Sequence, residues 1–263
     1  MVRIASLLLV LALVVSCASK KTVQSEWIQL FNGQNLDGWK VKFAGNVVGE
    51  NYKNTFRVEN GNLVVSYDEY ENFNDKFGHL ISDKVYSHYK LRVEYRFVGN
   101  QVNGGAAWAY RNNGLMLHSQ SAESMEPGQD FPTSIEVQLL GGIGDDDRTN
   151  LNVCTPGTII DINGKPLLSH CYNSSSKVIN GEDWTTVEIE VYGDSIFKHL
   201  FNGELVLEYT HPRLDPDSPD YQKLLSPETG DRLTKGHIAI QAESHRTEFR
   251  KIELLNLSDD CED

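Results

Sequence analysis

Phe131-Pro-Thr-Ser-Ile-Glu-Val-Gln-Leu-Leu-Gly-Gly142 has the alternation of apolar and polar residues that is typical of a β-strand. Side chains of a strand point alternately to its two faces, so the apolar residues would share one buried face: Ile135, Val137 and Leu139. The polar residues Glu136 and Gln138 would then project from the other face. We therefore predict a half-buried strand that presents a carboxylate and an amide side by side, and we expect the functional site here.

The rest of the chain carries the turn signals of an antiparallel β protein. Asn-Gly, the strongest short-range hairpin signal, begins at Asn32, Asn60, Asn103, Asn113, Asn163, Asn180 and Asn202. Alternating runs lie between these turns, at residues 91–97, 186–192, 195–201, 204–209, 238–245 and 248–255. Residues 195–201 and 204–209 are predicted to form a hairpin, and residues 238–245 are predicted to pair with residues 248–255. Many strands without helical crossovers predict an all-β fold, an antiparallel two-sheet sandwich or jelly roll.

The composition is that of an acidic globular protein. Of 263 residues, 40% are hydrophobic and 10% are aromatic, which is enough to bury a sizeable core. We predict one domain over residues 27–258, followed by an acidic tail at residues 259–263. The formal net charge of −13 argues against a nucleic-acid partner, because neutralising phosphates requires a basic face.

The N-terminus has the features of a bacterial lipoprotein signal. A short basic start precedes an apolar run at residues 4–15, which is too short to span a bilayer as a helix. Val14-Val15-Ser16-Cys17 resembles a lipobox, so we predict a signal peptide at residues 1–16, lipidation of Cys17 and a polar tether at residues 17–26. Ala18 after the cysteine, rather than aspartate, favours the outer membrane. An ordinary signal peptide or a retained membrane anchor is the alternative.

Three cysteines remain beyond Cys17. In an oxidising compartment Cys154 and Cys171 are the natural disulfide pair, and they would close a loop rich in turn residues. His170 could then simply pack against the disulfide. A metal site built from both cysteines and His170 is the alternative, although the spacing fits no zinc pattern. Cys261 is left over in the acidic tail.

Several motifs together resemble the 3-keto-disaccharide hydrolase family. Leu30-Phe-Asn-Gly-Gln-Asn-Leu-Asp-Gly-Trp39 is similar to the opening signature of that family. Further similar stretches follow in family order at residues 91–96, 113–118, 134–142, 154–158, 201–203 and 238–252. The resemblance implies a fold like that of the concanavalin A-like lectins and glucanases, a jelly roll whose concave face holds sugar.

The resemblance also implies a reaction. The ketone at C3 of an oxidised sugar acidifies the hydrogen on C2, so a base can remove it and the group on C1 can leave by β-elimination. Addition of water then completes the cleavage. This chemistry needs a base, an electrophile for the enolate oxygen and a proton donor for the leaving oxygen. A separate sugar 3-dehydrogenase would supply the ketone. A divalent metal ion remains open, and so does a non-catalytic, lectin-like glycan-binding role.

We can assign candidate residues to these roles. The predicted catalytic residues are Glu136, His118, His170 and Arg148. The predicted substrate-binding residues are Gln138, Glu94, Arg96, Asn113, Trp108, Gln241 and Glu243. Glu136, Gln138 and His118 are expected to project together onto the concave face, with the others around them. Glu136 has no acidic neighbour on its own strand face, which argues against the two-carboxylate arrangement of an ordinary glycosidase.

Purely structural explanations exist for several of these residues. His118 could be a hydrogen-bonded structural histidine, and Arg148 could pair with the aspartates at residues 145–147. Glu94 and Arg96 could form a cross-strand ion pair, which contributes little to stability when exposed.

The lipobox gives the first testable prediction. Replacing Cys17 by alanine should prevent lipidation and release the protein from the membrane fraction, because the lipid is the predicted anchor. Fractionation of cells that express the wild type and Cys17→Ala measures this directly. A variant that remains in the membrane fraction would show that a different anchor holds the protein.

Overall fold

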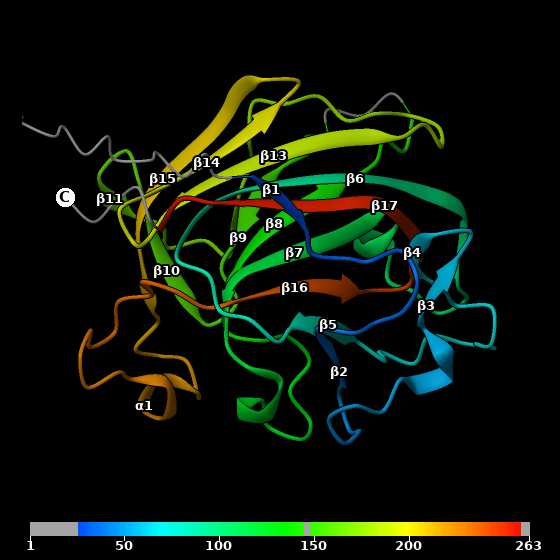
Figure 1. Cartoon of the computed structure of the whole chain (residues 1–263), viewed down its shortest axis with the longest axis horizontal. Helices are drawn as coiled ribbons and strands as arrows, with labels where there is room; N and C mark the ends of the chain where they lie inside the picture. Colours follow the sequence, from blue (N-terminus) through cyan, green and yellow to red (C-terminus); the bar gives the residue numbers. More distant parts are fainter. Residues whose placement is uncertain (1–25, 145–147, 259–263) are drawn as a thin grey trace, which may run out of the picture.

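The computed structural model describes residues 26–144 and 148–258 of the chain (Figure 1). The predicted signal peptide, the lipidation site at Cys17, Cys261, the acidic tail and the aspartates at residues 145–147 lie outside the described residues. Within the described ranges, none of the helices has the length and apolar character needed to cross a bilayer.

Two antiparallel sheets make up the fold (Figure 1). The ten-stranded sheet contains, in spatial order, β11 (Lys165–Pro166), β10 (Thr158–Ile162), β15 (Glu204–Leu214), β14 (Ile196–Phe201), β13 (Thr185–Tyr192), β6 (His88–Gln101), β17 (His245–Asn256), β4 (Asn62–Val65) and β3 (Phe56–Glu59), with β1 (Trp27–Gln29) also paired to β17. The seven-stranded sheet contains β12 (Cys171–Tyr172), β9 (Asn152–Cys154), β8 (Ile135–Leu140), β7 (Asn112–Ser119), β16 (His237–Ala242), β5 (Gly78–Ser82) and β2 (Trp39–Phe43). The described helical elements are α1 (Tyr221–Leu224) and short 3-10 turns at Tyr52–Asn54, Ala107–Ala109 and Ala122–Ser124. The predicted all-β, two-sheet jelly-roll sandwich is confirmed.

The core lies between the two sheets. The predicted apolar face of β8 is fully buried there, through Ile135, Val137 and Leu139. The ten-stranded sheet contributes the alternate residues of β6, which are also buried: Leu91, Val93, Tyr95 and Phe97. Because the parity of both strands is fixed by this burial, their remaining side chains must point to the two outer faces of the sandwich.

The hairpin predicted around Asn202 is confirmed, whereas the predicted last strand pair is wrong. β14 and β15 pair across Asn202-Gly203, and both turn residues have the positive φ that a tight hairpin of this type requires. β16 and β17, in contrast, belong to different sheets. The chain turns between them at Glu243 and Ser244, and Ser244 has a φ of 91°. Alternation shows that a segment is a strand but does not select its partner.

The predicted disulfide between Cys154 and Cys171 is present. The two cysteines are direct cross-strand partners on β9 and β12. The disulfide therefore ties the segment that comes after β10 and β11 back to the edge of the seven-stranded sheet.

Removing the disulfide should destabilise the fold. In the chain-entropy model a cross-link over a loop of this size stabilises by roughly 3 kcal/mol, because it restricts the unfolded chain. The double variant Cys154→Ala/Cys171→Ala should therefore unfold at lower denaturant than the wild type, with the free energy of unfolding measured by urea titration. An unchanged midpoint, or free thiols at both positions in the wild type, would contradict this.

Candidate functional site

A cavity of about 410 Å³ opens on the outer face of the seven-stranded sheet. Its lining residues come from distant parts of the chain: Trp108, Asn112, Phe131, Glu136, Gln138, Cys154, Pro156, His170, Cys171 and Glu243. Glu136 and Gln138 reach it because the opposite face of β8 is committed to the core. The prediction that these two side chains project together is confirmed.

The strands beside β8 leave room for these polar groups. On β9, Asn152 is the register partner of Gln138, and its Nδ2 donates a hydrogen bond to Gln138 Oε1 at 3.2 Å. On β7, a Cβ atom at Gly114 would lie 2.6 Å from Glu136 Oε1 and 3.1 Å from Gln241 Oε1. Any side chain at Gly114 would therefore collide with them, so the glycine lets Glu136 and Gln241 approach each other over β7.

Glu136 and Glu243 form a buried acidic pair. Their exposed fractions are 6% and 3%. Burial raises the pKa of Glu136 to about 7, because the ionised carboxylate loses its hydration. Burial and the charge of Glu136 together raise the pKa of Glu243 well above its ordinary value, while the charge of Arg148 opposes that shift. Two interacting carboxyl groups of this kind lose their protons in separate steps, so near neutral pH the pair offers both a base and an acid.

Arg148 lies beside this pair, as predicted, but it is anchored to the backbone. Its Nη1 donates hydrogen bonds to the carbonyls of Tyr110 at 2.7 Å and Gly141 at 3.1 Å. Its charge also contributes to the lowered pKa of His245, after burial and the charge of Arg111. Arg148 therefore stabilises the ionised form of Glu243 and holds the segment before β7 against the end of β8.

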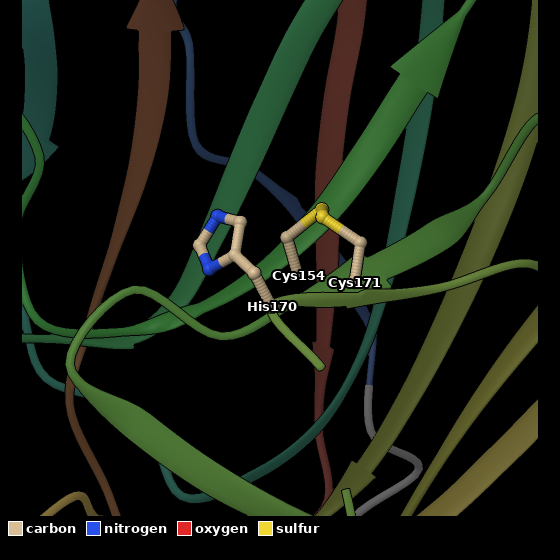
Figure 2. Close-up of side chains that lie close together, drawn as sticks. All are labelled: Cys154, His170 and Cys171. Atoms are coloured by element: carbon tan, nitrogen blue, oxygen red, sulfur yellow. A yellow bond between two sulfur atoms is a disulfide. The ribbon is translucent and has the colours of Figure 1, made fainter. Parts of the chain in front are cut away.

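His170 lies next to the disulfide (Figure 2), and all three residues line the cavity. The ring nitrogen and the two sulfur atoms lie within 4.8 Å of one another. Because the sulfurs are bonded to each other, neither can act as a thiolate ligand, and the alternative of a metal site on these three residues is not supported. His170 itself is exposed at the cavity, where it can reach a bound ligand.

An aromatic wall closes another side of the cavity. Trp108 is 56% exposed, and its ring stacks on Phe77 with centroids 6.3 Å apart and an interplanar angle of 13°. Phe77 in turn contacts Phe131, with ring centroids 4.8 Å apart. Trp108 is thus held by a packed layer with part of its surface open, which suits stacking on a sugar ring. The prediction that Trp108 belongs to the site is consistent with this placement.

The predicted position of His118 on the open face is wrong. Its Nε2 lies 3.0 Å from the carbonyl oxygen of Gly193, and its ring packs edge-on against Phe197 with centroids 5.1 Å apart, inside the sandwich. The reason is a β-bulge. The register between β7 and β16 shifts just before Ser119, and His118 has a φ of 47°. An extra residue in a strand inverts the parity of the residues at and beyond the bulge, so His118 points into the core.

Asn113 is also buried inside the sandwich rather than in the site, which corrects its predicted role. Its Nδ2 donates to the backbone carbonyl of Gln241 at 2.8 Å. Its neighbour Asn112 lines the cavity instead. Asn112 and Gly114 lie on the same face of β7, so the alternation of that strand could have predicted that Asn112 faces the cavity.

Glu94 and Arg96 are not part of this site, because β6 belongs to the ten-stranded sheet. Both side chains project from the outer surface of that sheet. Glu94 accepts a hydrogen bond from Arg250 Nη2 at 2.7 Å, and Arg96 Nη2 donates to Glu248 at 2.7 Å. Both residues therefore do form cross-strand ion pairs, and their partners lie on the neighbouring strand β17.

The remaining predicted residues, Gln241 and Glu243, do lie at the site. Glu243 lines the cavity, and Gln241 adjoins Glu136 over Gly114. Glu136 lacks an acidic neighbour only along its own strand. Sequence reasoning could not find the pairing with Glu243, because 106 intervening residues separate the two and only sheet order brings them together.

Solved structures share this fold. Two proteins of Parabacteroides distasonis ATCC 8503, provisionally assigned as glycosyl hydrolases, align over 88% of this chain with a TM-score of 0.52. One is 21% identical with 94% of its own chain covered, and the other is 16% identical with 100% covered. The metal-free exoplasmic/lumenal domain of VIP36 is 10% identical, with a TM-score of 0.50 over 88% of this chain and 90% of that one. At these identities the likeness establishes the fold alone.

Sequence comparison defines the family more closely. No curated protein matches the chain. Residues 26–255, which include every strand that contributes to the cavity, match the domain described as 3-keto-α-glucoside-1,2-lyase-like. The predicted resemblance is confirmed, and the chain belongs to the 3-keto-α-glucoside-1,2-lyase-like domain family.

Proposed function

We propose that this protein is an enzyme that cleaves 3-keto-glycosides by proton abstraction at C2, β-elimination at C1 and addition of water. The observation that carries the proposal is the buried Glu136–Glu243 pair at the cavity. A general base works best when its pKa lies near the working pH, and burial brings the pKa of Glu136 to about 7.

The two carboxyl groups take different roles. The Glu136 carboxylate removes the C2 proton, and the electron pair of the C2–H bond forms a C2=C3 double bond while the carbonyl π electrons move to the oxygen. When the enolate collapses, the bond between C1 and its substituent breaks. Glu243, which holds its proton more tightly, donates that proton to the departing oxygen. Addition of water across the resulting C1=C2 bond gives the net hydrolysis product.

Family membership supports this chemistry over direct glycoside hydrolysis. An ordinary glycosidase also uses two carboxyl groups as its catalytic residues, so the acidic pair does not distinguish the two reactions. The family description names a 3-keto-α-glucoside lyase, for which the base at C2 is the central requirement. A separate oxidoreductase must then supply the ketone, and we propose that the enzyme works at the outer membrane through the lipid on Cys17.

A glycan-binding role without catalysis is the second candidate. The half-exposed Trp108 at the cavity is the observation behind it, because an exposed aromatic ring can hold a sugar by stacking without any catalytic step. The two roles separate in one assay, in which purified protein is incubated with a 3-keto-disaccharide and products are followed by NMR. Carboxylate and amide oxygens are ligands that hard divalent cations prefer, so the assay is run with and without a chelator.

Glu136→Gln gives the sharpest test of the proposal. It keeps the shape of the side chain but removes the base, so turnover of a 3-keto-disaccharide should fall by roughly 10²–10⁴. Trp108→Ala should instead weaken substrate binding, because its role is contact with the sugar.

His118→Gln is the matched control. It should lower the free energy of unfolding by loosening a buried contact, while the turnover of the folded protein stays near that of the wild type. Full activity in Glu136→Gln, or binding without cleavage by the wild type, would contradict the enzyme assignment.

The pH profile depends on the same pair. Glu136 must be ionised to act as base, so kcat/KM should rise as pH increases through about 7. Glu243 must be protonated to act as acid, so activity should fall again at higher pH, and this descending limb should be absent or shifted in Glu243→Gln.

The buried Glu136 should make the protein less stable as pH rises. A carboxylate in an ion pair, whose pKa is lowered on folding, has the opposite effect. The pKa of Glu136 rises from 4.5 to about 7 on folding, so between these values the native state binds more protons than the unfolded state. The stability that this group contributes below pH 4.5, the pKa of the unfolded state, is therefore lost as pH rises towards about 7. Thermal unfolding from pH 4 to pH 8 should show a shallower decline for Glu136→Gln than for the wild type. Parallel curves for the two proteins would contradict a raised pKa of Glu136 in the folded protein.

A further inference from the structure

Buried polar atoms without partners gather beside the acidic pair. Within residues 26–144 and 148–258, neither Nε2 nor Oε1 of Gln241 has a hydrogen-bond partner, and the same is true of both ring nitrogens of His79. Both side chains are fully buried. A buried donor or acceptor that stays unpaired destabilises the fold, so such groups beside a cavity point to a ligand that completes them.

Gln241 and His79 are direct neighbours in the sheet. They are register partners on β16 and β5. On one side, Gln241 Oε1 and Glu136 Oε1 both border the space above Gly114. On the other side, the His79 ring packs against Phe131, which lines the cavity, with centroids 6.0 Å apart. The two side chains therefore form a polar row that starts at the base and runs under the aromatic wall.

His79 stays neutral in this position. Burial, with a contribution from the charge of Lys42, lowers the pKa of His79 to about 3. Lys42 itself is committed elsewhere, since its Nζ donates to the backbone carbonyls of Phe43, Asn46 and Pro127. A neutral imidazole has one N–H donor and one acceptor, and an amide has two N–H donors. The row thus offers neutral N–H groups and no mobile proton that would compete with the acidic pair.

We propose that Gln241 and His79 form the subsite that receives the C3 carbonyl oxygen of the keto-sugar and stabilises the negative charge that develops on it. The inference rests on the proposed function and names the electrophile that the elimination requires. As the C2 proton passes to the Glu136 carboxylate, the carbonyl π electrons move to the C3 oxygen, and Gln241 Nε2–H donates to that oxygen with His79 as the second neutral donor. Fixed donors in a dry site suit an enolate that exists only briefly.

A substrate analogue without a glycosidic leaving group isolates this step. A 3-keto-1,5-anhydrohexitol has the ketone and the C2 hydrogen, but C1 carries only the ring oxygen and no glycosidic substituent. The wild type in D₂O should exchange the C2 hydrogen for deuterium, which NMR detects, and Glu136→Gln should not. Gln241→Met keeps the volume of the side chain but removes its donors, so the exchange rate should fall by roughly 10²–10³. The dissociation constant of the analogue should change only a few-fold.

A histidine pair tests the second donor. His79→Gln keeps a neutral N–H group and should retain more exchange activity than His79→Leu, which has none. His237→Gln is the control on the same strand as Gln241, since His237 Nδ1 contacts the backbone carbonyl of Ser82 at 2.7 Å, away from the cavity. It should exchange at the wild-type rate. If His79→Leu does not fold, as judged by circular dichroism, Gln241→Met carries the test alone.

The outcomes distinguish the subsite from the function on which it rests. Exchange by Gln241→Met at the wild-type rate would overturn the subsite while leaving the enzyme assignment intact. So would a loss of binding with an unchanged rate in the bound state, because that pattern describes a residue that holds substrate and transition state equally. A wild type that neither exchanges nor cleaves any 3-keto sugar would overturn both.

Discussion

The burial of one face of the seven-stranded sheet is the constraint on which the site depends. Ile135, Val137 and Leu139 pack against the ten-stranded sheet in a core that excludes water. A shift of β8 by one residue would expose all three and bury the polar residues between them, so hydrophobic burial fixes the register. The position of Glu136 and Gln138 at the cavity is therefore enforced by the core beneath them rather than by contacts within the site.

That core also supports an acidic pair that opposes folding. Ionising either carboxyl group in a buried position costs free energy, which is why their pKa values are raised. Glu243 is held at the turn between β16 and β17, where the next residue, Ser244, donates its backbone N–H to Tyr67 Oη at 2.8 Å. Gln101 Nε2 donates to the Ser244 hydroxyl at 2.7 Å. Functional sites in many proteins contain arrangements that are unfavourable for folding and are stabilised by the rest of the structure. Here the surrounding sheets hold two acids together despite their mutual repulsion.

The features that the sequence determined by itself are strand parity, a tight turn, the disulfide pairing and the order of family motifs. The alternation in β8 predicted both its core-facing residues and the position of Glu136 on the opposite face, at the cavity, because side-chain direction in a strand depends only on parity. Asn202-Gly203 predicted its hairpin, because few residues adopt the required positive φ easily. The pairing of Cys154 with Cys171 was predicted from their spacing and the expected compartment. Motif order along the chain predicted the family that the comparison confirmed.

Tertiary structure decided which strands became neighbours and where parity was interrupted. Glu94 looked like a site residue until β6 was placed in the opposite sheet, and Glu243 gained its acidic partner only when β16 was placed one strand away from β8. A single bulge in β7 turned His118 from the open face into the core. Pairing between strands depends on contacts between residues far apart in the chain, and a bulge depends on how two such strands fit. Local alternation carries neither kind of information, so the acidic pair and the Gln241–His79 row emerge only from the folded sheet.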